Sequence, residues 1–146
     1  MRFRNKFGMT KGGTYNLSGG RLKLLVVDDE SDVQFLFQQK FRKEIKAGDI
    51  QIKYAYNGTS ALEFIDSVEN RTDYLILSDI NMPEMNGMEL LRKLKTKYPE
   101  LLVMMITAYG DENNFNLVKD LGADDYFTKP LQFELLKEKL NNTSSL

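Results

Sequence analysis

The chain has 146 residues, 42% of them hydrophobic and 28% charged, which fits one soluble globular domain and excludes a disordered or fibrous chain. It has no cysteine, which excludes disulfides, thiolate chemistry and Cys-ligated zinc, and no histidine, so any phosphohistidine chemistry needs a histidine on another molecule. A metal bound by this chain should therefore be a hard, oxygen-liganded cation such as Mg²⁺, Ca²⁺ or Mn²⁺.

The net charge of −1 hides an uneven distribution along the chain. Residues 1–21 contain five Lys and Arg and no acid, whereas the remainder holds 15 Lys and Arg against 21 Asp and Glu. An acidic body with a short basic leader is not the pattern of a nucleic-acid binder. Because KGGTYNLSGG (11–20) is rich in Gly, Ser and Asn, we expect 1–21 to be a flexible basic N-terminal extension or a cloning remnant, in preference to a segment that contacts an anionic surface.

No stretch is apolar enough to span a membrane or to serve as a secretory signal. The longest purely apolar run is LLVMMI (101–106), and the N-terminus lacks an apolar core. A cytoplasmic location, without a membrane partner, is therefore the default expectation.

Strand and helix patterns alternate from Leu22 onward. Strands are predicted over 22–27, 50–56, 73–78, 101–107 and 125–128. Three of these are nearly continuous apolar runs, which is typical of strands covered on both faces of a parallel sheet. Each strand is followed by a helix pattern, so the sequence predicts a doubly wound α/β fold, with a five-stranded parallel sheet flanked by five helices. We expect one domain over 22–141 and a disordered tail over 142–146.

The five helix patterns differ in how clearly their ends are marked. Ser31 and Gln34 have the spacing of a capping box, as do Ser60 and Glu63, and Asn86 with Glu89 resembles it. Gly122 suits the left-handed position that follows a helix over 113–121. The fifth helix is predicted over 133–140. The expected apolar stripes are Val33, Leu36, Phe37, Phe41 and Ile45 on the first helix; Leu62, Ile65 and Val68 on the second; and Leu90, Leu91 and Leu94 on the third.

Chemically active side chains recur where these strands end. The first strand runs into Asp28 and Asp29, and the third into Asp79. Thr107 ends the fourth strand and Lys129 follows the fifth. Because ligands of open α/β sheets bind beyond the carboxyl ends of the strands, these groups should converge. Neighbouring carboxylates would then form a hard-cation site, in which Mg²⁺ relieves their repulsion. The plain alternative makes each a solvated loop residue, and for Glu30 we prefer that interpretation.

The stretch DINMPEMNG (79–87), with the Asp28–Asp29 pair, Thr107–Ala108 and Lys129–Pro130, resembles the receiver domains of two-component response regulators. The resemblance covers about 22–140 and implies the (βα)₅ receiver, or flavodoxin-like, fold. It also implies a signalling domain that accepts a phosphoryl group and has intrinsic phosphotransfer and autodephosphorylation activity, not an enzyme with a separate substrate.

The resemblance assigns roles to the residues at the strand ends. Asp79 would be the phosphorylated nucleophile, attacking a phosphohistidine on a partner. Mg²⁺, with Mn²⁺ as a substitute, would be held by Asp29, Asp79 and the backbone carbonyl of Asn81, with Asp28 bound directly or through water. Lys129 and the Thr107 hydroxyl would contact phosphoryl oxygens.

Further expectations follow from the same resemblance. The Lys129–Pro130 bond should be cis. Gly87 and Pro83 should shape the loop beside Asp79. Phosphorylation should draw Thr107 inward, with Tyr126 following, and so repack the face made by the fourth helix, fifth strand and fifth helix. The alternative for Tyr126 is a half-buried edge aromatic. Asn81 and Tyr109 occupy positions that tune phosphoryl lifetime, and we hypothesise that Tyr109 screens the attacking water.

The expected partners are a sensor histidine kinase or phosphotransfer protein, docking around 33–41, and a downstream output protein or fused output domain. The domain would be a monomer or a weak phosphorylation-dependent dimer. Three other functions are alternatives to this one. A phosphatase of the haloacid-dehalogenase-like group needs a second acid two residues after its nucleophile, where this chain has Asn81. A flavodoxin-like cofactor binder needs a Gly-rich loop after the first strand. A degenerate receiver that serves only for docking would not need all five site residues.

Overall fold

The computed structural model describes residues 22–108 and 112–145. Five parallel strands form one sheet in the order β2-β1-β3-β4-β5. Their bounds lie within one residue of those predicted: β1 (Leu22–Val27), β2 (Ile50–Ala55), β3 (Tyr74–Asp79), β4 (Leu102–Thr107) and β5 (Asp125–Thr128). Because β1 neighbours both β2 and β3, the strand order reverses direction at β1, which confirms the doubly wound fold and puts the switch point between β1 and β3.

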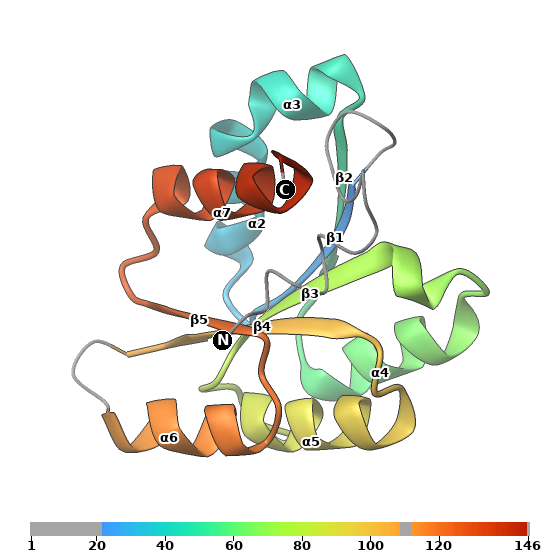
Figure 1. The fold of residues 1–146 in the computed structure, drawn as a ribbon, viewed down its shortest axis with the longest axis vertical. Helices are drawn as coiled ribbons and strands as arrows, with labels where there is room; N and C mark the ends of the chain where they lie inside the picture. Colours follow the sequence, from blue (N-terminus) through green and yellow to red (C-terminus); the bar gives the residue numbers. More distant parts are fainter. Residues whose placement is uncertain (1–21, 109–111, 146) are drawn as a thin grey trace.

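Helices cover both faces of this sheet (Figure 1). One face carries α2 (Ser31–Lys40), α3 (Arg42–Ala47) and α7 (Phe133–Ser145), and the other carries α4 (Gly58–Ser67), α5 (Gly87–Lys97) and α6 (Glu112–Asp120). A 3₁₀ turn, η1 (Arg71–Asp73), precedes β3. Within the described ranges, every helix is too short or too polar to cross a membrane.

The core consists of two apolar layers, one on each face of the sheet. Leu24 and Val26 of β1 point toward α2 and α7, whereas Leu25 and Val27 point toward α4 and α5. All four are at most 2% exposed. The unbroken apolar runs of the sequence are therefore explained, because neither face of a central strand meets water.

The predicted count of five helices is wrong, since the described residues contain six α-helices. The first predicted helix is divided at Phe41, whose backbone (φ −105°, ψ 21°) leaves the helical region. Phe41 itself stays buried against Phe37 and Phe133, so α3 turns while its aromatic anchor remains in the core. Two residues expected in the apolar stripe are exposed, Leu36 of α2 to 41% and Ile45 of α3 to 37%. No Gly or Pro marks this bend in the sequence.

Two of the three predicted capping boxes are also wrong. The N-cap of α2 is Glu30, with no side-chain cap bond, and α4 begins earlier than expected, with Asn57 accepting a hydrogen bond from Ser60 N at 2.7 Å. Only Asn86 caps its helix as predicted, through Glu89 N at 3.0 Å. A capping side chain must match the backbone that enters the helix, and spacing alone does not reveal that backbone.

Two further helix predictions are confirmed, and one is wrong. Leu90, Leu91 and Leu94 of α5 are fully buried, and Gly122 has φ +101° after α6. The helix α7 continues to Ser145, so its predicted end at 140 is too early and its backbone enters the segment expected to be a disordered tail. The expected leader 1–21 lies outside the described residues.

A buried ion pair ties α5 to the segment before β5. Lys95 Nζ lies 2.7 Å from Asp124 Oδ2, and the two side chains are 12% and 6% exposed. The same carboxylate oxygen accepts a hydrogen bond from Val103 N of β4 at 2.9 Å, and Lys95 also donates to Leu101 O. One carboxylate therefore joins a helix, a strand and a loop.

We expect Asp124→Asn to lower the free energy of unfolding by about 3 kcal/mol, because it leaves the Lys95 ammonium without its counter-charge in a buried place. Urea unfolding followed by circular dichroism measures this. The matched control is Asp66→Asn, whose partner Lys97 is 52% exposed and should be easily resolvated. If both variants lost the same free energy of unfolding, burial would not be the reason that the Lys95–Asp124 pair stabilises the fold.

The chain after β3 passes unusually close to its own backbone at Gly87. A Cβ there would lie 2.1 Å from the backbone oxygen of Asp79 and 2.7 Å from Ile80 Cα. Gly87 N donates to Ile80 O at 2.8 Å, which holds the loop in this closed form. Glycine is thus required here by contact with backbone atoms that have nowhere to move.

Gly87→Ala should destabilise the fold by about 3 kcal/mol or more, because β3 or the loop must shift to admit the methyl group. Gly58→Ala is the matched control. A Cβ at Gly58 would have its three nearest contacts with the Met85 side chain, with Sδ at 2.8 Å, Cγ at 2.9 Å and Cβ at 3.0 Å, so Met85 must shift, but none of these atoms is a backbone atom. Thermal unfolding of both variants checks this, and a Gly87→Ala protein as stable as the Gly58→Ala protein would contradict the close approach.

Candidate functional site

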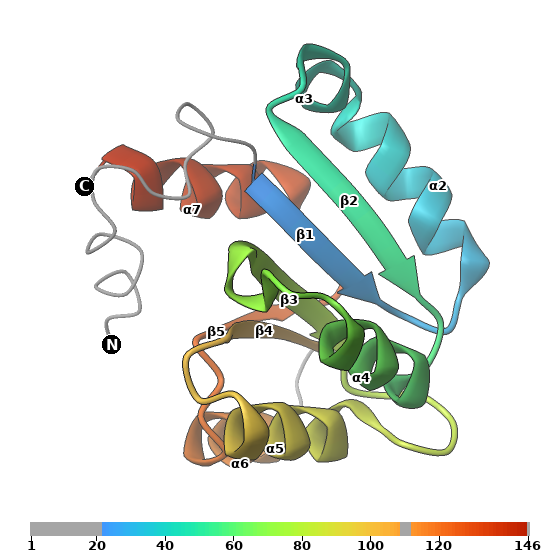
Figure 2. The ribbon, with the colours of Figure 1, turned by 90° about the vertical axis from the view of Figure 1, so that its right-hand side faces the viewer.

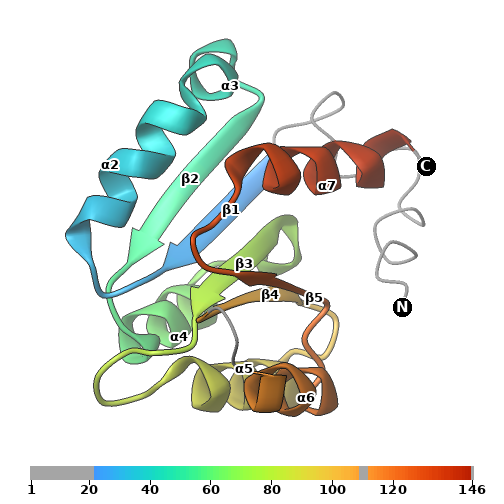
Figure 3. The same cartoon turned by 90° about the vertical axis from the view of Figure 1, so that its left-hand side faces the viewer.

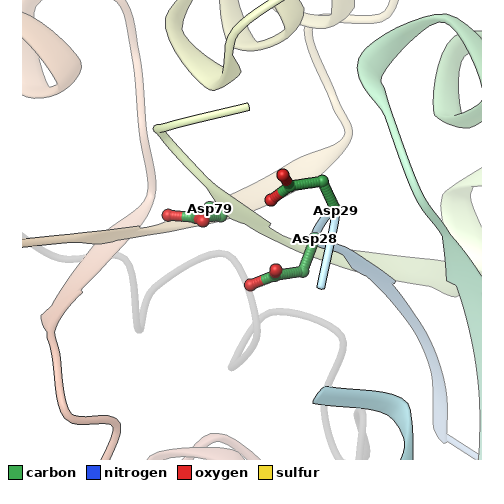
Figure 4. Close-up of side chains that lie close together, drawn as sticks. All are labelled: Asp28, Asp29 and Asp79. Carbon is green, nitrogen blue, oxygen red and sulfur yellow. The ribbon is translucent and has the colours of Figure 1, made fainter. Parts of the chain in front are cut away.

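Three carboxylates gather beyond the ends of β1 and β3, the adjacent strands at the switch point (Figure 4). One oxygen each of Asp28, Asp29 and Asp79 lies within 4.8 Å of the other two. This spacing allows all three to reach one cation, and a purely carboxylate donor set favours a hard ion such as Mg²⁺. The residues therefore fit the metal that the sequence predicted.

The three acids differ in their exposure to water. Asp28 and Asp79 are 6% and 2% exposed, whereas Asp29 is exposed. Asp79 is the last residue of β3, so the sheet fixes its backbone, and Asn81 N donates a long hydrogen bond (3.4 Å) to its Oδ1. The nucleophile candidate thus lies at the floor of the site, and Asp29 lies at its mouth.

The buried Asp28 carboxylate is held in an unfavourable charge environment. Burial raises its pKa to about 6, and the charge of Asp79 adds to this effect. A hydrogen bond of 2.9 Å from Glu30 N, and the positive charge of Lys129, act in the opposite direction. Glu30 thus contributes its backbone to the site, while its side chain is exposed, as the plain interpretation predicted.

Lys129 provides the positive charge opposite these acids. Its Nζ lies 3.1 Å from Asp79 Oδ2, and its side chain is 40% exposed. Burial lowers the pKa of this ammonium, but the hydrogen bond to Asp79 and the charges of Asp79 and Asp28 outweigh burial, so the pKa is raised above its usual value. The predicted cis bond between Lys129 and Pro130 is present. Lys129 N donates to Thr107 O at 2.8 Å, which fixes the end of β5 against β4.

The Thr107 hydroxyl is buried, and its Oγ1 has no hydrogen-bond partner within the described residues. Its neighbour Ile106 pairs with Asp79 in the β3–β4 ladder, so Thr107 lies one residue beyond the acid on the next strand. Since a buried hydroxyl without a partner costs free energy, this group is available to a ligand.

Tyr126 lies on β5, away from the acids. It is partly buried and packs edge-on against Phe115 of α6, with ring centroids 4.6 Å apart, beside a cavity of about 300 Å³. This position agrees with both interpretations of Tyr126, the switch residue and the edge aromatic. Tyr109, proposed to screen the attacking water, lies outside the described residues.

The sequence did not predict two features of the site's surroundings. Tyr56, after β2, donates a hydrogen bond to Gln34 of α2, which joins two segments at the rim beside Asp28. Glu84 adopts φ +64° in the β3–α5 loop, without the glycine that usually marks such a position. Neither feature has a sequence signal, because each depends on how distant segments or the loop backbone are arranged.

Comparison with known proteins gives a consistent result. The family model described as response regulator receiver domain matches residues 24–141. Sporulation initiation phosphotransferase F of Bacillus subtilis (strain 168) is 33% identical over 116 residues, covering 80% of this chain and 88% of that protein. Transcriptional regulatory protein ZraR of Klebsiella oxytoca is 34% identical over 125 residues, covering 86% of this chain but 27% of that longer protein.

A solved structure of a response regulator receiver domain protein from Clostridium thermocellum has a TM-score of 0.71 and 28% identity, covering 84% of this chain and 94% of that one. The resemblance predicted from the motifs is thereby confirmed in sequence and in fold. The chain belongs to the response regulator receiver domain family, whose role is phosphorylation-mediated signalling.

Proposed function

We propose that this domain accepts a phosphoryl group on Asp79 from a phosphohistidine of a sensor histidine kinase or phosphotransfer protein. The proposal depends on one observation above all. Asp79 is buried at a strand end, in contact with Lys129 and within one cation's reach of Asp28 and Asp29. A buried carboxylate that contacts a lysine and can share a cation with two further acids is suited to being the acceptor.

The transfer conserves atoms and charge in a simple way. An Asp79 carboxylate oxygen forms a bond to phosphorus while the phosphorus–nitrogen bond to the partner's imidazole breaks, and the nitrogen keeps the bonding electrons. The Lys129 ammonium, now paired with Asp79, moves its charge to a phosphoryl oxygen of the product. The Thr107 hydroxyl, which has no partner among the described residues, would gain a phosphoryl oxygen as hydrogen-bond acceptor. Hydrolysis of the resulting acyl phosphate would return the domain to its resting state.

Asp28, Asp29, Asp79 and the backbone carbonyl of Asn81 would hold Mg²⁺, or Mn²⁺ in its place. When bound, the ion would neutralise negative charge on the carboxylates and on the phosphoryl oxygens. This assignment is supported by the close approach of the three acids and by the preference of hard cations for oxygen ligands.

The signal would pass from Thr107 to Tyr126. Movement of Thr107 toward the phosphoryl group would free space on the side of β5 where Tyr126 packs against Phe115. The adjoining cavity of about 300 Å³ gives the ring room to move inward. The repacked surface of α6, β5 and α7 would then bind an output protein or a fused output domain, or form a weak dimer.

We expect incubation with Mg²⁺ and a phosphorylated histidine kinase, or a small phosphodonor, to label Asp79. Asp79→Asn should reduce labelling at least about 100-fold, because an amide cannot replace the carboxylate nucleophile. Glu30→Gln is the matched control, a neighbouring exposed acid that should keep labelling within about twofold. Mass spectrometry of the intact protein, which detects the mass of the added phosphoryl group, measures the labelling of both variants.

Two results would decide against this function. A wild-type protein that stays unlabelled with a competent donor would contradict it. Turnover of unrelated phosphomonoesters, abolished by the same Asp79→Asn change, would favour the small-molecule phosphatase instead.

Asp28 should make the metal-free fold sensitive to pH. Its pKa in the fold is about 6, above its usual value of 3.8, so the folded state holds this proton more tightly than the unfolded chain. The contribution of Asp28 to the free energy of unfolding should therefore fall as pH rises from about 4 to about 6, and this loss should remain constant above that range. Asp28→Asn removes the penalty, so we expect the metal-free variant to gain about 2 kcal/mol of stability at neutral pH.

Urea unfolding in EDTA on both sides of this pH window measures the effect, with exposed Asp29→Asn as control. Added Mg²⁺ should stabilise the parent protein more than the Asp28→Asn variant. If Asp28→Asn raised the free energy of unfolding by the same amount at both ends of this pH range, the raised pKa of Asp28 would be contradicted.

A further inference from the structure

The strand β2 forms an edge of the sheet. Among the described strands it pairs with β1 alone. Leu22 N donates to Asp49 O and Asp28 N donates to Ala55 O, so odd-numbered residues of this segment point their backbone groups toward β1. Because the hydrogen-bonding direction alternates along a strand, the N–H and C=O groups of Ile50, Ile52 and Tyr54 point away from the sheet. These are the groups that an added strand would bind.

The strand β2 lies beside the helices α2 and α3 (Figures 2 and 3). Residues of β2, α2 and α3 line a groove of about 710 Å³ along this edge. Ile50, Ile52 and Tyr54 line it from the strand, and Ile45 lines it from α3. The bend at Phe41 is what leaves Ile45 37% exposed beside the strand instead of buried beneath the helix. The groove thus combines apolar side chains with an edge that can form backbone hydrogen bonds.

The charged residues that line this groove are both basic. Arg42 and Lys46 of α3 line it, both exposed, and no carboxylate does so among the described residues. The acid between them in sequence, Glu44, faces α7, where its Oε2 lies 3.3 Å from Lys137. Two cations along an apolar groove in an otherwise acidic domain favour an anionic occupant.

We propose that this groove binds an extended acidic segment of a partner protein, which adds to β2 as a further strand. Side chains of an added strand alternate between faces, so every second residue would lie on the α3 side. Acidic residues at those alternate positions would meet Arg42 and Lys46. A second copy of this chain would instead bring its own Arg42 and Lys46 to the same edge, and the basic segment 1–21 would also be repelled.

The test is fluorescence anisotropy with the unphosphorylated protein, so that its outcome is independent of phosphotransfer at Asp79. The probe is a short labelled peptide in which Glu alternates with Val and Thr. The double change Arg42→Glu and Lys46→Glu should weaken binding about tenfold or more, because two attractions become repulsions. Lys43→Glu is the matched control, an exposed cation on the same helix that does not line the groove.

The peptide itself tests strand addition. N-methylation at the residues whose N–H faces β2 should abolish binding, whereas N-methylation at the alternate residues should leave it unchanged. Equal effects of the two methylated series, or equal binding by the Arg42→Glu, Lys46→Glu variant, would overturn the proposal. So would a dimer in size-exclusion chromatography that this variant dissociates, since the occupant would then be a second copy.

Discussion

Mutual repulsion among three carboxylates is the constraint on which the rest of this structure depends. Asp28, Asp29 and Asp79 stand close enough to share a cation, and two of them are almost fully buried. Such an arrangement weakens the fold: burial raises the pKa of Asp28, and the nearby charge of Asp79 adds to this effect. It persists because β1 and β3 are central strands with both faces covered, so the acids cannot move apart without disrupting the sheet.

The neighbouring elements are arranged to hold this unfavourable site in place. Lys129 places its ammonium against Asp79 from the end of β5, and Gly87 lets the loop after β3 close down onto the Asp79 backbone. The buried Lys95–Asp124 pair joins α5 to β4 and to the segment before β5. Rigid strands and a closed loop thus keep the carboxylates in a geometry that a cation or a phosphoryl group can relieve.

The two edges of the sheet, β2 and β5, have different surroundings. Strand β5 lies between α6 and α7 with Tyr126 beside a cavity, which suits a surface that rearranges. Strand β2, at the opposite edge, borders a groove with basic residues on α3, which suits a surface that receives a segment from outside. The groove residues do not include any of the three acids, so a ligand could bind there without entering the carboxylate site.

The sequence by itself determined the strand bounds, the doubly wound topology and the convergence of Asp28, Asp29, Asp79, Thr107 and Lys129. These depend on local apolar runs and on the rule that parallel strands share a carboxyl edge, both of which are readable along one chain. The motif DINMPEMNG also indicates the family from the sequence alone.

Only the tertiary structure decided the bend at Phe41, the choice of Asn57 as the N-cap of α4, the burial that separates Asp28 from Asp29, and the groove beside β2. The bend depends on an aromatic ring held between distant elements, and the difference between two adjacent acids depends on which one faces the sheet. Packing between segments far apart in sequence sets these features, and no local pattern records it.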